Sequence, residues 1–247
     1  MLYSFLVRFK VIELNKENRK IERFKEKNIF KNLGNLDLVL SNVLTRDREY
    51  SLNKSYFIRV SCLTLEARQK IGSYLIKAQA FGEEIDFQNQ KIVFEETILN
   101  EQKSSYTRKI DLEDFLNLQV KDIINIRFLS PTMFKFGDEY YIEPNPYLYL
   151  LKTSKKFIEL FPEGDIKGEV LGIPKYIFKS VKVKSADIKT KDVRVKDRKY
   201  KGFVGEVVFD LSSIEDKFKK GINYLFYFSY FTGVGEFTEL GLGQVKI

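Results

Sequence analysis

The chain has 247 residues, of which 44% are hydrophobic and 31% are charged, a composition that is typical of a folded globular protein and excludes long disorder. It contains no histidine, which excludes Ser-His and Cys-His nucleophile pairs, histidine zinc sites and imidazole acid-base catalysis. Any proton transfer must therefore use Tyr, Lys, Asp, Glu or water. The formal net charge of +8 favours a polyanionic partner if it is concentrated in one region.

The chain opens with an apolar stretch that alternates with polar residues. Residues 2–12 include Arg8 and Lys10, and no small-residue cleavage site follows them. This pattern predicts a first β-strand and not an export signal. No apolar run reaches the ~20 residues that a membrane-spanning helix needs. We therefore expect a cytoplasmic protein with no membrane partner.

The rest of the first half predicts strands around one long helix. A charged stretch at 16–33 has weak helical periodicity, and strands are predicted at 36–41, 54–63 and 91–99. Thr64 is a predicted helix cap, and the helix should run to residue 81. Its predicted apolar face consists of Leu65, Ile71, Leu75 and Ile76, with Tyr74 at the flank.

The single cysteine, Cys62, lies in the predicted strand 54–63 and should be a buried, inert thiol. One cysteine forms no internal disulfide and no thiolate metal cage. The carboxylates show no metal-ligand spacing either, so we expect no metal site and no cofactor.

The second half repeats the order of elements. A strand is predicted at 123–130, and Asn145-Pro146 is a typical helix start. Further strands are predicted at 175–186, 190–197 and 202–211. Ser212 and Glu215 have capping-box spacing before an apolar helix at 213–231, and a short strand ends the chain.

Each half therefore approximates strand, helix, two strands, helix, strand. This order predicts an α+β protein of two tandem ferredoxin-like (RRM-like, βαββαβ) domains. We place the boundary in the polar connection at 100–122, giving domains of residues 1–121 and 122–247.

Positive charge is concentrated in residues 175–201, which hold eleven Lys and Arg against three Asp, so this segment alone nets +8. Lys182 and Lys184 should share one strand face, and Arg194 and Lys196 should share one face of a second strand. A hairpin of two such strands would follow a phosphate backbone, whereas the simpler interpretation is a solvated face. The candidate RNA-binding cations are Lys179, Lys182, Lys184, Lys189, Lys191, Arg194 and Lys196.

The C-terminal segment 233–243 contains four glycines in eleven residues. Such a loop permits positive φ, and successive backbone N–H groups in it are able to cradle phosphate oxygens. Many loops of this kind are only tight connections. The chain also has 14 Tyr and 22 Phe, and exposed Tyr140, Tyr141 or Tyr200 would be able to stack unpaired bases, although most aromatic residues should be core.

The tail TGVGEFTELGLGQVKI resembles the C-terminal signature of the CRISPR-associated repeat-cleaving RNases, the sixth numbered Cas family of the RAMP superfamily. FLSPTMFK followed by GDEYYIEPNPYLYL resembles that family's Ser-Pro-Thr segment and its helix entry. ADIKTKDVRV resembles a strand before the family's basic hairpin, and YKGFVGEVVFDL resembles its Gly-Phe-x-Gly strand. The similarity covers most of 126–247 and, faintly, 36–63.

The resemblance implies binding of CRISPR repeat RNA and its metal-independent cleavage, by attack of a 2′-hydroxyl on the adjacent phosphate, with a role in antiviral defence. It implies Gly233, Gly235, Gly241 and Gly243 as the RNA-positioning loop. Many family members use a histidine that this chain lacks. The histidine-free catalytic candidates are therefore Lys27, Lys31, Arg46, Arg48, Tyr50 and Lys54.

Two alternatives remain open at this stage. The chain could be an inactive relative that holds guide RNA as a structural subunit among CRISPR effector-complex proteins. It could also be a general single-strand nucleic-acid module. The sequence is compatible with a monomer or a homodimer.

Overall fold

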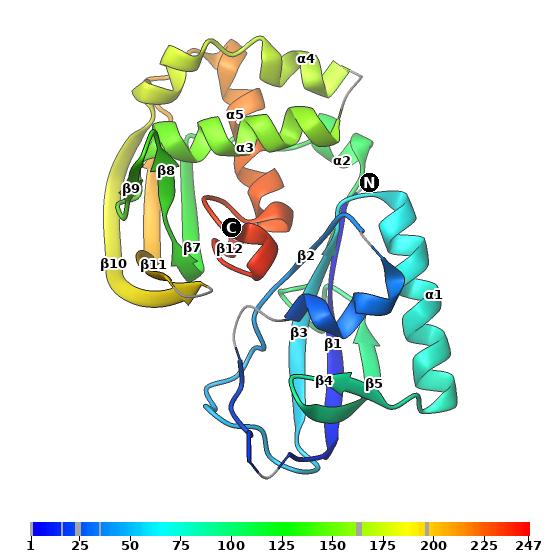
Figure 1. The fold of residues 1–247 in the computed structure, drawn as a ribbon. Helices are drawn as coiled ribbons and strands as arrows, with labels where there is room; N and C mark the ends of the chain where they lie inside the picture. The colour runs from blue at the N-terminus through cyan, green and yellow to red at the C-terminus, as the bar shows by residue number, and fades with distance from the viewer. Residues whose placement is uncertain (1, 16, 23–25, 35, 162–164, 196–197) are drawn as a thin grey trace. The chain divides into compact units, whose positions relative to one another are not determined.

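The computed structural model describes residues 2–15, 17–22, 26–34, 36–161, 165–195 and 198–247 (Figure 1). It separates into two compact units, Met1–Ile110 with Glu239–Gly241, and Asp111–Thr238 with Leu242–Ile247. The boundary that we place between residues 121 and 122 stays a prediction. Among the described residues, no helix combines the length and the apolar character that crossing a bilayer requires.

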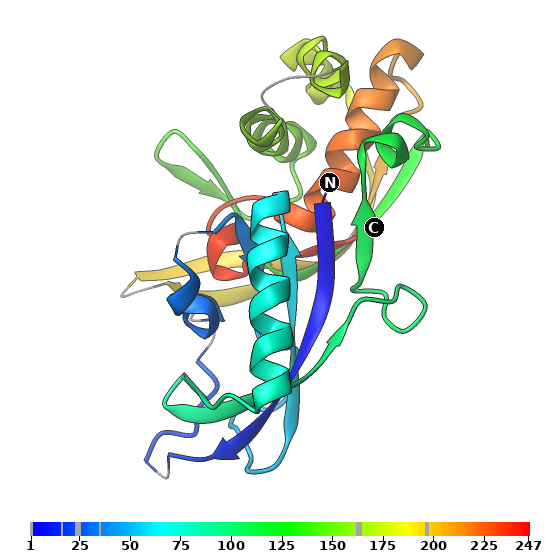
Figure 2. The same ribbon diagram turned by 90° about the vertical axis from the view of Figure 1, so that its right-hand side faces the viewer.

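The first unit is built on one antiparallel sheet with the strand order β2-β3-β1-β5-β4, and β6 also pairs with β1. Its strands are β1 (Leu2–Glu13), β2 (Leu38–Leu40), β3 (Ser55–Cys62), β4 (Ile85–Phe87), β5 (Gln90–Ile98) and β6 (Arg108–Ile110). Its helices are the 3-10 helix η1 (Glu26–Leu33) and α1 (Leu65–Phe81), which lies along one face of the sheet (Figure 2).

The start of α1 is the one that the sequence predicts, but its buried face differs. The Thr64 side chain accepts a hydrogen bond from the Ala67 N–H, and this caps the helix. Leu65 and Ile76 are 56% and 71% exposed, so the predicted apolar face is wrong at these positions. The helix instead turns a narrower stripe of smaller residues to the sheet, consisting of Ala67, Ile71, Leu75 and Ala78.

The second unit has a four-stranded antiparallel sheet in the order β10-β11-β7-β12 and a separate β8-β9 hairpin. Its strands are β7 (Ile123–Thr132), β8 (Phe134–Phe136), β9 (Glu139–Tyr141), β10 (Lys182–Val195), β11 (Arg198–Asp210) and β12 (Val245–Lys246). Helices α3, α4 and α5 gather on one side of this sheet (Figures 1 and 2). Its helical segments are α2 (Leu112–Leu116), α3 (Pro146–Leu160), α4 (Asp165–Leu171), η2 (Lys175–Ser180) and α5 (Asp216–Thr232). The 3-10 helix η3 (Thr238–Leu240) begins in this unit, and its last two residues belong to the first unit.

Both sheets follow the same rule. In each unit the first strand lies between the third and the last strand of the βαββαβ order, and the second strand lies beyond the third. This is the ferredoxin-like arrangement, so the predicted α+β fold with two tandem ferredoxin-like domains is confirmed.

Two predictions about residues 175–197 are wrong. Residues 175–180 form the 3-10 helix η2, which follows Pro174 and buries Ile177 and Phe178. Residues 182–195 form one strand and not parts of two, because no Gly or Pro interrupts this stretch. The hairpin therefore pairs β10 with β11, and segment 186–195 is part of that hairpin and does not precede it.

The N-terminus of α3 is confirmed: Asn145 accepts a hydrogen bond from the Leu148 N–H, and Pro146 is the first helical residue. The capping box predicted for α5 is wrong. The cap position is Glu215, and its side chain makes no capping hydrogen bond.

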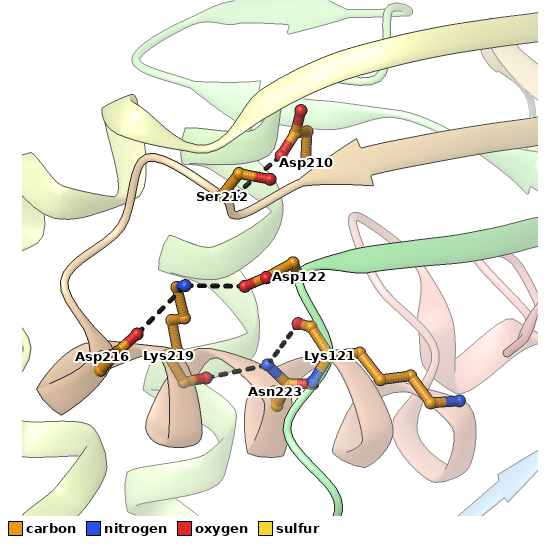
Figure 3. A network of polar contacts seen from close by, with 7 residues as sticks. All are labelled: Lys121, Asp122, Asp210, Ser212, Asp216, Lys219 and Asn223. Atoms are coloured by element: carbon orange, nitrogen blue, oxygen red, sulfur yellow. Dashed lines mark hydrogen bonds and ion pairs between the residues drawn. The ribbon is translucent and has the colours of Figure 1, made fainter.

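A polar network fastens the first turns of α5 to the segment that leads into β7 (Figure 3). The Lys219 ammonium lies 2.7 Å from the Asp122 carboxylate and 3.1 Å from that of Asp216. The fully buried Asn223 side chain accepts from the Lys121 N–H and donates to the carbonyls of Lys121 and Lys219. Contacts between side chains of α5 and the segment before β7 thus provide the anchoring that the helix cap does not.

Candidate functional site

Strand β10 is the edge strand of the second unit's sheet, and almost all of it is exposed. A row of exposed cations lines an edge whose backbone has a neighbour on one side only. These cations are Lys182, Lys184, Lys189, Lys191 and Arg194 on β10, with Arg198, Lys199 and Lys201 on the adjoining end of β11. We refer to these eight residues as the basic edge.

The strand register distributes the basic edge over both faces of the sheet. Lys189 lies opposite Val204, Lys191 opposite Gly202 and Val193 opposite Tyr200. Alternation therefore places Lys189, Lys191 and Tyr200 on one face, whereas Arg194 faces the other way. The sequence predicted outward faces only for Lys182, Lys184, Arg194 and Lys196, each opposite an apolar inner side, and it assigned no face to Lys189 and Lys191.

That apolar side exists only near the end of β10. Val193 and Val195 are 6% and 5% exposed, but Val183 is 38% exposed next to a bulge in the β10-β11 register. Lys179 lies outside the strand, on η2, with its ammonium 5.4 Å from the centre of the Tyr147 ring. Lys196 lies outside the described residues.

The glycine-rich segment has the backbone conformation that its composition predicts. Gly233, Gly235, Gly241 and Gly243 have φ of 65°, 89°, 81° and 64°. A Cβ at Gly243 would collide with the Val234 carbonyl, and one at Gly235 with the Met133 carbonyl. A Cβ at Gly241 would lie 2.9 Å from the Leu40 carbonyl oxygen, within the first unit. Glycine is therefore required at these positions mainly because other backbone segments of this chain approach them closely.

Many N–H groups of this segment are already used inside the second unit. Val234 N–H donates to the Gly243 carbonyl at 2.9 Å, and Gly243 N–H donates to the Pro131 carbonyl at 3.1 Å. Glu236 N–H donates to the Met133 carbonyl at 2.9 Å. These donors hold the segment in place and do not cradle phosphate, so RNA contact by the four glycines stays a prediction.

Two lysines of α3 brace the glycine-rich segment, and sequence reasoning missed them. The Lys152 ammonium lies 2.6 Å from the Glu236 carboxylate. Lys156 donates to the Thr232 carbonyl and to the Thr238 hydroxyl, each at 3.2 Å. The available signal was their spacing of four residues, which places both on one helix face.

Four of the catalytic candidates lie on the connection between β2 and β3 in the first unit, namely Arg46, Arg48, Tyr50 and Lys54. Arg46 and Arg48 are exposed. The Lys54 ammonium lies 2.6 Å from the Asp47 carboxylate. This ion pair raises the pKa of Lys54 and lowers the pKa of Asp47. Lys54 therefore keeps its proton, which suits stabilisation of a negative charge and does not suit a general base.

The remaining two candidates lie on η1, whereas Tyr50 of the connection is buried in the core. Lys27 and Lys31 belong to η1, and their side chains lie outside the described residues. Tyr50 is 2% exposed, packs against Tyr56 and Phe87, and donates its hydroxyl to the Gln88 side chain at 3.1 Å. The structure therefore gives Tyr50 a place in the core, where its ring supports the connection that bears Arg46 and Arg48.

Comparison with known proteins gives three findings. Residues 126–245 match the model of a family described as CRISPR-associated endoribonuclease Cas6. A search of curated proteins finds no match.

Solved structures of low sequence identity share the fold over nearly the whole chain. A Cas6 product complex has a TM-score of 0.80 at 17% identity, covering 99% of this chain and 98% of that one. A second Cas6 product complex has a TM-score of 0.75 at 18% identity, with the same coverage. Thermus thermophilus Cas6 has a TM-score of 0.74 at 15% identity, covering 99% and 97%. Residues 126–245 of this chain therefore resemble the Cas6 endoribonuclease family, and the whole chain has the fold of the solved Cas6 structures.

Proposed function

We propose that the protein binds CRISPR repeat RNA and cleaves it endonucleolytically without a metal ion, releasing CRISPR RNA from its precursor. The observation that supports this most directly is the Cas6 family match over the unit that bears the basic edge. Similar folds have been solved as Cas6 complexes with a product and with a substrate mimic. A row of exposed cations on a sheet edge is suited to neutralising the phosphates of such an RNA.

In the proposed reaction, the 2′-oxygen forms a bond to the adjacent phosphorus and the bond from phosphorus to the 5′-oxygen breaks. The 2′-hydroxyl loses its proton and the leaving 5′-oxygen gains one, which yields a cyclic phosphate and a 5′-hydroxyl. The protein must align the 2′-oxygen and stabilise the charged phosphorane. We assign the second task to exposed cations of the first unit, Arg46, Arg48 and Lys54, with Lys27 and Lys31 on η1.

A second candidate function is RNA retention without cleavage. It is favoured by the absence of histidine from the sequence, because no side chain of this chain exchanges a proton near neutral pH as imidazole does. In that case the protein would hold guide RNA in the cytoplasm, as a subunit among CRISPR effector-complex proteins.

The decisive experiment incubates the purified protein with labelled repeat RNA in EDTA. Parallel RNAs each bear a 2′-deoxy substitution at one candidate position. Cleavage at one phosphate, abolished by one 2′-deoxy substitution, is the result expected of the proposed ribonuclease. Tight binding without cleavage would support the RNA-holding function, and equal affinity for scrambled RNA would overturn both.

A second arm compares Lys54→Ala with Lys70→Ala. Both lysines are paired with a carboxylate at 2.6 Å, but Lys70 lies on α1, away from the candidate connection. If Lys54 stabilises the phosphorane, its removal lowers the single-turnover cleavage rate about a hundredfold to a thousandfold, and Lys70→Ala does not. Equal rates for the two variants would remove Lys54 from the site.

A further inference from the structure

Three segments that are distant in the sequence meet in an aromatic cluster within the second unit. The Tyr140 ring on β9 lies 5.2 Å from the Tyr200 ring on β11, measured between ring centres. The Tyr200 ring lies 5.1 Å from the ring of Phe237, which belongs to the glycine-rich segment. We refer to Tyr140, Tyr200 and Phe237 as the aromatic cluster.

The cluster is accessible and lies among cations. Tyr140 is 39% exposed, and the other two rings are partly exposed. The Lys135 ammonium lies 5.9 Å from the centre of the Tyr140 ring. The register of β10 and β11 places Tyr200 on the same sheet face as Lys189 and Lys191.

The backbone holds one member of the cluster in an uncommon conformation. Phe237 has φ of 59°, in the left-handed region that a bulky residue rarely adopts. The neighbouring N–H of Glu236 is tied to the Met133 carbonyl, and the Glu236 carboxylate is tied to Lys152. Such strain persists only where the surrounding structure imposes it, and here it brings the Phe237 ring against Tyr200.

The Tyr140 phenol remains neutral at physiological pH. Burial is the main cause that raises the pKa of Tyr140 above its usual value, and the neighbouring Tyr200 is the next. Neutral aromatic faces flanked by lysines offer stacking surface for a base and positive charge for its phosphate.

We propose that the aromatic cluster is a stacking site for an unpaired base of a bound RNA single strand, with Lys135, Lys189 and Lys191 neutralising the adjacent phosphates. The proposal rests on the proposed function, since it assigns the base-contacting part of the same RNA-binding unit. It predicts affinity for unstructured RNA as well as for the repeat.

The test uses the full chain and an oligouridine that carries one central 2-aminopurine, whose fluorescence is quenched when it stacks on an aromatic ring. Tyr140→Leu removes the ring and keeps apolar bulk. Tyr141→Leu is the matched control, because Tyr141 is 37% exposed on the same strand but bonds Glu139 instead of joining the cluster. Phe237→Leu is the second cluster variant, and circular dichroism verifies the fold of each.

We expect quenching by the wild-type protein that is lost in Tyr140→Leu and Phe237→Leu, with affinity about fivefold to a hundredfold weaker. Tyr141→Leu should behave as the wild type. Equal behaviour of Tyr140→Leu and Tyr141→Leu would overturn the stacking site, even if repeat RNA is bound and cleaved. Conversely, Tyr140-dependent quenching without preference for repeat RNA would uphold the stacking site and remove the CRISPR function. Absence of binding to either RNA would overturn both.

Discussion

Single glycines show how closely the backbone packs in this protein. Gly243 and Gly137 have nearly the same positive φ, 64° and 62°, but different surroundings. A Cβ at Gly243 would collide with the Val234 carbonyl, whereas a Cβ at Gly137 would meet nothing within 4 Å. Comparing substitutions at the two positions therefore separates the stability lost through the left-handed conformation from the stability lost through the collision.

We predict that Gly243→Ala lowers the free energy of unfolding by more than Gly137→Ala does. Gly137→Ala should cost about 1 kcal/mol, from the conformation alone. Gly243→Ala must also displace backbone and should cost about 2 kcal/mol or more. Urea unfolding of both variants measures the difference. Equal losses in the free energy of unfolding would show that the backbone around Gly243 shifts without cost to accommodate a Cβ.

Cys62 is a second residue whose behaviour follows from burial. It is fully buried in β3, and burial raises its pKa to about 12. The sequence-based prediction of a buried cysteine is confirmed.

We predict that a thiol reagent modifies Cys62 only after unfolding. Since the thiolate is the reactive form, the native rate should stay low at pH 9, where an unfolded cysteine is largely ionised. The measurement compares reaction rates in buffer and in denaturant across pH. Fast native modification at neutral pH would contradict the burial of this thiol.

At the scale of elements, α5 illustrates how a helix is anchored without a cap. Eleven of its residues are buried, yet Glu215 makes no capping hydrogen bond. The anchoring comes from Asn223 and Lys219, which bind the segment before β7 (Figure 3). The ion pairs with Asp122 and Asp216 raise the pKa of Lys219, and Asp122 has the larger effect.

We predict that Asn223→Ala lowers the free energy of unfolding by about 1–3 kcal/mol, because it removes the hydrogen bonds that a fully buried amide makes with the backbone N–H and carbonyl of Lys121. Ser212→Ala is the matched control, since Ser212 is exposed and is the residue from which a capping box was predicted. It should change stability by less than about 0.5 kcal/mol. A larger effect of Ser212→Ala in thermal unfolding would restore a capping role for this serine.

For the whole molecule, the distribution of charge matters more than its total. Residues 175–201 contain an excess of eight positive charges, which equals the net charge of the chain. Most of these cations line the basic edge, with one neighbouring strand and open solvent around them. RNA binding by this edge should therefore depend strongly on ionic strength.

We predict that replacing Lys189, Lys191 and Arg194 by Ala reduces the slope of log affinity against log salt by as much as about 2, at roughly 0.7 per phosphate on a single strand. The control replaces Lys70, Lys77 and Lys103, three exposed lysines of the first unit, which matches the change in net charge. Filter binding across a salt series measures both. Equal slopes for the two variants would place the RNA elsewhere.

The sequence by itself determined the ferredoxin-like fold, most of its strands and long helices, the starts of α1 and α3, the burial of Cys62 and the exposure of most cations of the basic segment. These features follow from alternation, helix caps and composition, which act over a few neighbouring residues. The continuity of β10 could also have been predicted, since no Gly or Pro interrupts it. Its run of charged residues was instead interpreted as parts of two strands.

Only the tertiary structure decided which face each cation of β10 takes, that Tyr50 lies in the core, and that the backbone around Gly243 uses its own N–H groups. It also decided that the Tyr200 ring contacts both Tyr140 and Phe237, and that two lysines of α3 brace the glycine-rich segment. These features depend on strand register and on contacts between residues far apart in the chain. Local sequence patterns do not encode such contacts, because a side chain's partner is chosen by the packing of the whole unit.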